Sequence, residues 1–138
     1  LALRALNEVV RRYPKSEYAR AARLKVDLAH NHLAGREMEV GRFYQGRKQY
    51  SGAINRFRVV IEKYQTTSHV PEALHRLVET YLALGVAEEA QATAAVLGHN
   101  FPGSEWYQYS YLLLEGRNLK PEAIDDSWIS RTWTSLFE

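Results

Sequence analysis

The stretch GRFYQGRKQYSGAINRF, residues 41–57, decides how this chain folds. Its first half places a small residue, Gly41, three positions before an aromatic one, Tyr44. After a turn that ends near Tyr50, a second small residue, Ala53, stands four positions before Phe57. Residues three or four apart share one face of a helix, so each pair defines the packing face of one helix. The stretch therefore predicts two helices joined by a short turn.

A second unit of the same kind follows between residues 77 and 102. It has an apolar and aromatic set, a Leu-Gly break, two small residues and a closing proline: Leu77, Val78, Tyr81, Leu84, Gly85, Ala90, Ala94 and Pro102. The small residues let helices approach closely, the aromatic side chain fills the remaining gap, and the proline stops the second helix. These spacings are typical of the tetratricopeptide repeat. We therefore predict an all-α fold, a tetratricopeptide-like helical repeat solenoid that serves as an interaction module.

A hexapeptide recurs at the boundaries between repeats. YPKSEY at residues 13–18 returns as FPGSEW at residues 101–106, each time between the end of one helix and the start of the next. Proline cannot continue the first helix, and Ser16 and Ser104 are placed to accept hydrogen bonds from the free N–H groups that open the second. This recurrence supports a repeat architecture.

One helix is expected to be unusually long. From Tyr18 to about Arg47 the chain has no proline. Its apolar residues keep a helical spacing at Ala22, Val26, Ala29, Leu33, Val40 and Tyr44. Gly35 costs about 1 kcal/mol relative to alanine inside a helix, so the helix could bend or break there.

The following helices are shorter. An apolar stripe predicts that the helix after residue 50 packs on one side, through Ala53, Ile54, Phe57, Val60, Ile61 and Tyr64. Further helices are expected over residues 71–84, 87–98 and 105–114, the first with Pro71 in its first turn and Gly85 at its end. In this register Ala53 and Ala90 lie at helix crossings and are buried.

The C-terminal segment carries its own apolar pattern, at Trp128, Ile129, Trp133, Leu136 and Phe137. We expect residues 1–116 to form the tetratricopeptide repeats and residues 117–138 to form a C-terminal capping segment over the open end of the solenoid. The alternative is that this short amphipathic segment contacts a membrane surface or a partner.

Composition argues against several other classes of protein. The net charge is +2 and no run of five basic residues occurs, so nucleic acid is not an expected partner. Cysteine is absent, and no apolar run approaches the ~18 residues of a membrane span.

The helical pattern of the chain already begins at Leu3, and the sequence lacks an initiator methionine. We therefore expect the C-terminal part of a longer array.

Catalysis, metal binding and cofactors are not expected. His30 and His32 are two positions apart and point to different helix faces, and His69 and His75 are six apart across a helix start. We interpret these histidines as surface or capping residues. No serine stands in the strand–turn–helix setting of a nucleophile elbow, so the sequence predicts a protein that is not an enzyme.

Three segments together resemble the BamD family, the ComL-type lipoproteins: YPKSEY at 13–18, EMEVGRFY at 37–44 and YSGAINR at 50–56. The resemblance implies a lipoprotein on the periplasmic face of the outer membrane, anchored by a lipid outside this fragment. It also implies a scaffold subunit of the machinery that assembles outer-membrane β-barrel proteins. The implied partner is the POTRA region of BamA, with other lipoproteins of the same complex as further candidates.

A partner site is expected where the long helix ends and the next begins. Arg56 follows Asn55 on the side of its helix that the apolar stripe leaves free, and we expect Arg47 to lie close to it across the turn. Both arginines would be charged anchors, framed by Tyr44, Tyr50 and Asn55. The resemblance implies that the Asn-Arg pair matches the position through which the family meets an acidic residue of BamA.

The alternatives are of different classes. The arginines could form intrachain pairs with Glu39 or Glu62, each worth about 0.2–1 kcal/mol on an exposed face. The protein could also be a generic periplasmic tetratricopeptide adaptor that binds an extended peptide in its concave groove. A more distant possibility is a peripheral membrane protein that uses Trp128 and Trp133.

Overall fold

The computed structural model describes residues 2–137, which form seven helices and, within that range, no strand. They are α1 (Ala2–Arg12), α2 (Glu17–Gly46), α3 (Tyr50–Lys63), α4 (Val70–Leu84), α5 (Ala87–Asn100), α6 (Glu105–Glu115) and α7 (Trp128–Phe137). The predicted all-α fold is confirmed. None of these helices is long and apolar enough to cross a membrane.

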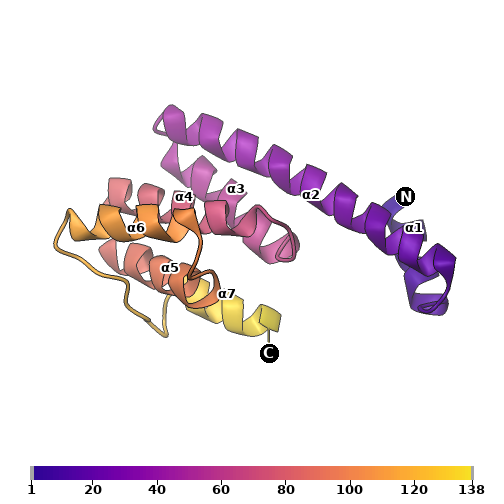
Figure 1. The fold of residues 1–138 in the computed structure, drawn as a ribbon. Helices are drawn as coiled ribbons and strands as arrows, with labels where there is room; N and C mark the ends of the chain where they lie inside the picture. The colour runs from indigo at the N-terminus through magenta and orange to yellow at the C-terminus, as the bar shows by residue number, and fades with distance from the viewer. Residues whose placement is uncertain (1, 138) are drawn as a thin grey trace.

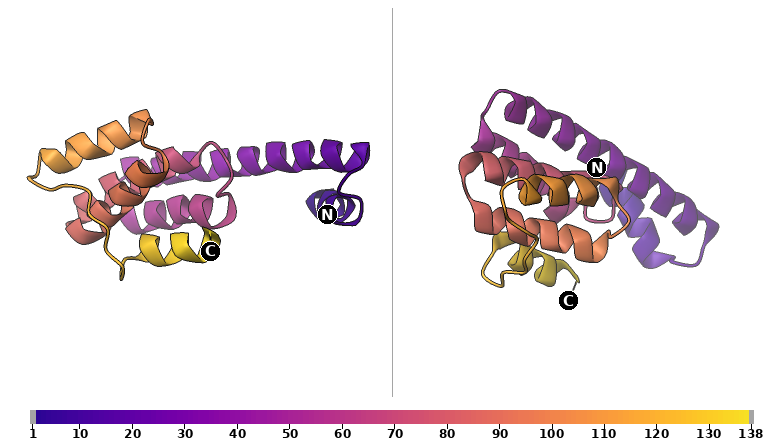
Figure 2. Two further views of the ribbon diagram at one scale, coloured as in Figure 1. Left: turned by 60° about the horizontal axis from the view of Figure 1, so that its bottom comes forward. Right: turned by 60° about the vertical axis from the view of Figure 1, so that its left-hand side comes forward.

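Successive helices pack against one another as neighbouring pairs, from α1 with α2 through to α4 with α5, and α6 returns to lie on α4 (Figure 1). The helix α2 is the longest, with 30 residues. Its C-terminal half lies over α3, whereas its N-terminal half extends past the body of the molecule to meet α1 (Figure 2). This arrangement of sequential helix pairs agrees with the predicted tetratricopeptide-like solenoid.

Local signals set the helix ends where the sequence predicts them. The Oγ of Ser16 accepts a hydrogen bond from the backbone N–H of Ala19 at 2.9 Å, and the Oγ of Ser104 accepts one from Trp106 at 3.1 Å. Pro71 stands in the first turn of α4, and Gly85 ends that helix in the left-handed conformation, at φ 81°. Each signal acts within a few residues of its own position, so sequence alone can locate it.

The helix α2 is continuous through Gly35, so the possible break does not occur. A Cβ at residue 35 would stand 3.4 Å from Nε2 of His69, which means that the glycine lets the loop before α4 approach the helix. The two halves of α2 bury different faces. Leu33 continues the spacing of the face that packs on α1 and is exposed, whereas in the second half Ala34 and Met38 are buried.

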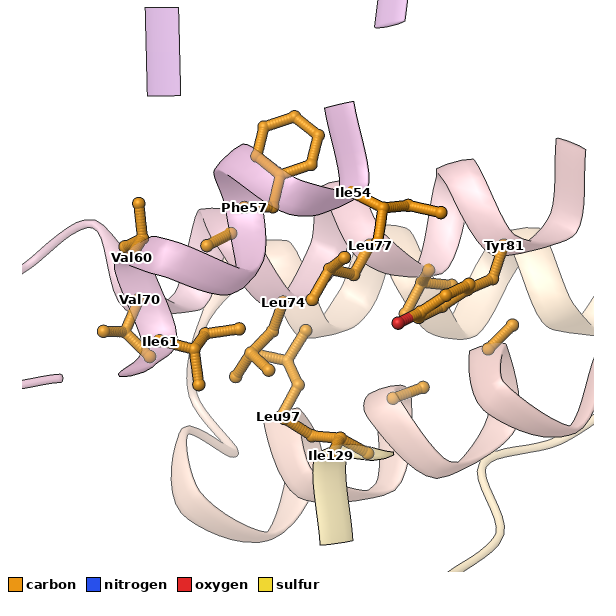
Figure 3. Close-up of a cluster of buried hydrophobic side chains, with 14 of the residues drawn as sticks. Ile54, Phe57, Val60, Ile61, Val70, Leu74, Leu77, Tyr81, Leu97 and Ile129 are labelled. Atoms are coloured by element: carbon orange, nitrogen blue, oxygen red, sulfur yellow. The ribbon is translucent and has the colours of Figure 1, made fainter. Parts of the chain in front are cut away.

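The core lies between α3, α4 and α5 (Figure 3). The predicted stripe of α3 is confirmed, since Ala53, Ile54, Phe57, Val60 and Ile61 are buried and Tyr64 is half-buried. It meets Leu74 and Leu77 of α4, Leu97 of α5 and Ile129 of α7. Ala53 and Ala90 are both fully buried, as predicted.

The segment 128–137 forms α7, which packs against α5. Ile129 is fully buried, and the ring of Trp128 lies under the guanidinium of Arg58 at 4.4 Å. The backbone N–H of Trp128 donates to Oε1 of Glu89 at 3.1 Å, so a side chain of α5 satisfies an open donor at the start of α7. The division into a repeat unit of residues 1–116 and a cap of residues 117–138 stays a prediction.

Candidate partner-binding site

The turn from α2 to α3 is short and held by backbone hydrogen bonds. The N–H of Arg47 donates to Tyr44 at 3.1 Å, and the N–H of Gln49 donates to the same carbonyl at 2.9 Å. Lys48 takes the left-handed conformation, with φ 61°, which favours glycine because glycine has no Cβ to clash. The backbone around Arg47 is therefore fixed by local geometry.

Two glycines bring α2 and α3 into close contact. A Cβ at residue 41 would stand 2.5 Å from Cε1 of Phe57, and one at residue 52 would stand 3.3 Å from Cδ2 of Tyr44. The ring of Phe57 therefore fills the space beside Gly41, and the ring of Tyr44 packs over Gly52. These contacts fix the helix spacing and place Arg56 of α3 alongside α2.

Arg56 forms an ion pair with Glu37 across the two helices. Its Nη1 donates to Oε2 of Glu37 at 3.2 Å, and 43% of the arginine side chain remains exposed. The hydrogen bond to Glu37 and the negative charge of that carboxylate raise the pKa of Arg56 above its usual value, and Tyr44 adds to this effect. The predicted intrachain partners, Glu39 and Glu62, are wrong, because the face of α2 that meets α3 carries Glu37.

Arg47 has a different neighbour. Its guanidinium lies 5.2 Å from the centre of the Phe43 ring, and 57% of Phe43 is exposed. The Phe43 and Tyr44 rings are 6.1 Å apart, and Tyr44 lies next to Arg56. The two arginines are therefore linked through a row of two aromatic rings. The sequence analysis did not identify Phe43 or Glu37 as site residues. The spacing of Phe43 from Arg47, and of Glu37 from Tyr44, places each pair on one helix face.

The other two predicted framing residues, Asn55 and Tyr50, both belong to α3. Asn55 is exposed on α3. Tyr50 is half-buried and lines a separate hollow with Lys48 and Leu84, at the end of α4. The structure thus brings Tyr44 to Arg56, while Tyr50 lines the hollow at the end of α4.

A network of charged side chains ties α2 to α4 next to the turn. Nη1 of Arg42 donates to Oε2 of Glu72 at 3.0 Å, and Nε2 of Gln45 donates to Oε1 of Glu79 at 3.1 Å. Arg76 joins the two carboxylates, at 3.2 Å from Glu72 and 3.0 Å from Glu79. This network holds the end of α2 against α4.

His75 is buried between α4 and α6, so its interpretation as a surface or capping residue is wrong. Its Nδ1 lies 2.8 Å from Oγ of Ser110, and its Nε2 lies 3.5 Å from Oε2 of Glu79. Burial alone would raise the pKa of Glu79, but hydrogen bonds with His75 and Gln45 and the charges of His75 and Arg76 outweigh it and lower the pKa to about 2. Ser110 is fully buried, so this serine–histidine–glutamate arrangement cannot present a nucleophile to a substrate.

Metal chemistry has no candidate within residues 2–137, because no group of three acidic, histidine or cysteine side chains is arranged to hold an ion there. The end of α2 and the first half of α3 offer instead an exposed aromatic ring, two arginines and a connecting turn held by backbone hydrogen bonds. Forked arginine donors suit carboxylate acceptors, and aromatic and arginine side chains are enriched at protein interfaces. The arrangement is suited to binding an acidic protein surface.

Comparisons with known proteins agree on one family. A family model described as "YfiO: Outer membrane lipoprotein" matches residues 1–97. Among similar curated proteins, the outer membrane protein assembly factor BamD of Caulobacter vibrioides is 56% identical over 120 residues, which cover 87% of this chain and 39% of that protein. BamD of Rickettsia prowazekii is 49% identical, over 80% of this chain and 44% of that protein. BamD of Neisseria meningitidis serogroup A is 37% identical, over 80% and 41%. The chain thus spans about two fifths of the length of these relatives.

Proposed function

The chain belongs to the outer membrane lipoprotein family of BamD, and from this membership we propose that it is a scaffold subunit of the machinery that assembles outer-membrane β-barrel proteins, binding the POTRA region of BamA. Family membership confirms the resemblance drawn from the sequence. From it we infer that the protein is an assembly factor without catalytic activity, on the periplasmic side of the outer membrane.

The proposal rests on the ion pair and the exposure of the Arg56 side chain. Its ion pair with Glu37 uses Nη1, and nearly half of the side chain stays exposed on α3, which packs closely against α2. Holding a guanidinium in one position before binding reduces the entropy that must be lost when an acceptor arrives. An acidic residue of a POTRA domain could therefore pair with Arg56 while Glu37 keeps the side chain in place.

Arg47 and Phe43 extend the proposed contact. The guanidinium covers one face of an aromatic ring that is more than half exposed. Burial of such a ring against a partner removes apolar surface from water, and Arg47 adds a second cation beside it. The interface would then combine the apolar ring of Phe43 with the positive charges of Arg47 and Arg56. These charges suit an acidic partner.

Calorimetric titration with a POTRA fragment tests the proposal. Truncating one member of a desolvated charge pair costs about 2–5 kcal/mol, so Arg56→Glu should weaken binding by more than tenfold, since each ~1.4 kcal/mol is a factor of ten. Arg47→Glu should also weaken it. Helicity and melting temperature should change little, because an exposed ion pair contributes only about 0 to 1 kcal/mol.

Two control variants sharpen the test. Arg20→Glu reverses a charge on the exposed surface at the far end of α2 and should leave the affinity unchanged. Glu37→Gln removes the intrachain partner and should affect affinity far less than Arg56→Glu. If Arg56→Glu and Arg47→Glu both bind the POTRA fragment as tightly as the parent chain, the site lies elsewhere on the solenoid.

A further inference from the structure

Lys48, in the turn between α2 and α3, has a backbone conformation that lysine rarely adopts. Its φ is 61°, and Asn118 is the other residue besides glycine with a positive φ in the described part of the chain. Asparagine tolerates this conformation because its short polar side chain can hydrogen-bond locally, whereas lysine has no such compensation. Residues held in unfavourable backbone conformations cluster at functional sites. The conformation of Lys48 therefore points to a role for its side chain.

This side chain lines the hollow at the end of α4. The hollow has a volume of about 330 Å³, and its other lining residues are Gln49, Tyr50, Ser51, Gly52 and Leu84. The α2–α3 turn and the end of α4 lie at the same end of the molecule (Figure 1). Leu84 is 47% exposed, and Tyr50 is half-buried. The Lys48–Leu84 hollow, as we call it, thus combines apolar surface with one cation.

The hollow adjoins the row of arginines and aromatic rings described above. Lys48 follows Arg47 directly in the turn. Gly52, which lines the hollow, also packs against the Tyr44 ring, since a Cβ at residue 52 would stand 3.3 Å from Cδ2 of that ring. Tyr44 in turn lies next to Arg56. A protein surface that covers the two arginines therefore comes close to the Lys48–Leu84 hollow.

The charges at the hollow favour an acidic occupant. Lys48 is exposed and makes no ion pair with any residue in the described part of the chain. Nη1 of Arg117 donates to the carbonyl of Leu82 at 3.2 Å, which places a second cation beside the end of α4. Among residues 2–137 no acidic side chain lines the hollow. Glu88, the carboxylate that follows α4 in sequence, belongs to the first turn of α5.

We propose that the Lys48–Leu84 hollow is a second contact for the partner of the arginine row, an inference that rests on the proposed function. It takes an aliphatic side chain of the POTRA region that stands beside a carboxylate. The aliphatic side chain packs against Leu84 and Tyr50, and the carboxylate pairs with Lys48. Lysine is then favoured at this position for binding, although glycine is favoured there for folding.

Calorimetric titration of the whole chain with a POTRA fragment tests the role of Lys48. Lys48→Gly should weaken binding by about threefold, the size expected for the loss of an exposed ion pair. Lys48→Glu should weaken it by about tenfold, because it also sets like charges against each other. Lys48→Arg keeps the charge and should bind nearly as the parent chain does.

Two further measurements separate a contact from a structural role. The affinity of Lys48→Gly should fall less steeply with salt than that of the parent chain, because one charge pair fewer is screened. The urea midpoint of the same variant should rise while its affinity falls. A residue that served the fold alone would change both in the same direction.

The apolar half of the hollow has its own variant. Leu84→Ser should weaken binding of the POTRA fragment by about fivefold, since part of the leucine is already packed and only the rest becomes buried. Leu28→Ser is the matched control, because Leu28 is 60% exposed on α2 and does not line the hollow. Lys63→Glu reverses an exposed charge at the other end of α3 and should leave the affinity unchanged. Circular dichroism verifies that each variant keeps its helices.

The results distinguish this inference from the proposed function. If Lys48→Glu or Leu84→Ser binds as tightly as the parent chain while Arg56→Glu binds more weakly, the inference is refuted and the proposed function stands. If the POTRA fragment does not bind the parent chain, both are refuted. An equal loss in Lys63→Glu and Lys48→Glu would show an effect of net charge and not of a contact. Sedimentation with anionic phospholipid vesicles should show no binding that depends on Lys48, and such binding would contradict the inference by assigning this cation to a lipid surface.

Discussion

Gly41 of α2 lies directly against the ring of Phe57 of α3, at a distance that leaves no room for a Cβ: such an atom would stand 2.5 Å from Cε1 of the ring. Both residues are buried, and Phe57 belongs to the core cluster that Figure 3 shows. Because the turn that carries Arg47 follows α2 directly, this contact also sets where the proposed partner site lies relative to the rest of the fold.

Gly41→Ala should therefore destabilise the protein. The added methyl group must push the Phe57 ring or the whole of α3 away, at a cost of about 1–3 kcal/mol in the free energy of unfolding. Urea denaturation followed by circular dichroism measures this value. Gly46→Ala is the control, since a Cβ at residue 46 meets nothing within 4 Å, and alanine there should be neutral or stabilising. Equal behaviour of the two variants would contradict the close contact.

Lys48→Gly should stabilise the protein, although it removes a side chain. Lys48 has φ 61°, a conformation that costs a residue with a Cβ about 1–2 kcal/mol, whereas glycine adopts it freely. The greater freedom of glycine in the unfolded chain offsets part of this gain, so we expect a net increase of about 0.5–1 kcal/mol in unfolding free energy. Gly85→Ala, at φ 81°, should have the opposite effect. A loss of stability in Lys48→Gly would show that the lysine side chain contributes more than its backbone costs.

The contribution of Glu79 to stability should depend on pH. Its pKa is lowered from 4.5 to about 2 in the folded protein. The unfolded chain therefore binds the proton more readily, so the stabilisation is fully present above pH ~4.5 and is lost as the pH falls toward 2. Its size is at most on the order of 3 kcal/mol, from about 1.4 kcal/mol for each pKa unit.

Urea denaturation at several pH values measures this effect. Glu79→Gln should destabilise the protein at pH 7, and the difference from the parent chain should shrink between pH 5 and pH 3. Glu62→Gln changes an exposed carboxylate that makes no ion pair in the described residues, and should alter stability by less than about 0.5 kcal/mol throughout. A difference for Glu79→Gln that stays constant with pH would refute the linkage.

Ile129 anchors α7 to the core, since its side chain is fully buried beside Leu97. Ile129→Ala should cost about 2–5 kcal/mol, because it leaves a cavity among core side chains. It should also make Trp128 and Trp133 more accessible to a fluorescence quencher. Leu24→Ala changes an exposed residue of α2 and should have little effect on either measurement. Full quenching of both tryptophans in the parent chain would mean that α7 does not stay docked in solution.

Most helix boundaries could be predicted from the sequence because the signals that set them are local. Ser16 and Ser104 cap the helix that follows each of them, Pro71 sits in a first turn, and Gly85 ends α4 where its φ requires glycine. The apolar stripe of α3 could also be predicted, because this helix packs against the core with the same face along its whole length. These features depend on the conformation and periodicity of a few neighbouring residues.

The tertiary structure alone decided which side chains meet across helices. The long helix α2 packs on α1 with one half and on α3 and α4 with the other, so its buried face changes and Leu33 is exposed whereas Met38 is buried. The same rotation presents Glu37, rather than Glu39, to Arg56. His75 is buried because α6 returns to α4, bringing Ser110 from 35 positions away. Periodicity shows that a helix has an apolar face, but its rotation against distant neighbours follows from packing the whole core at once, where small residues such as Gly41 set how closely the helices approach.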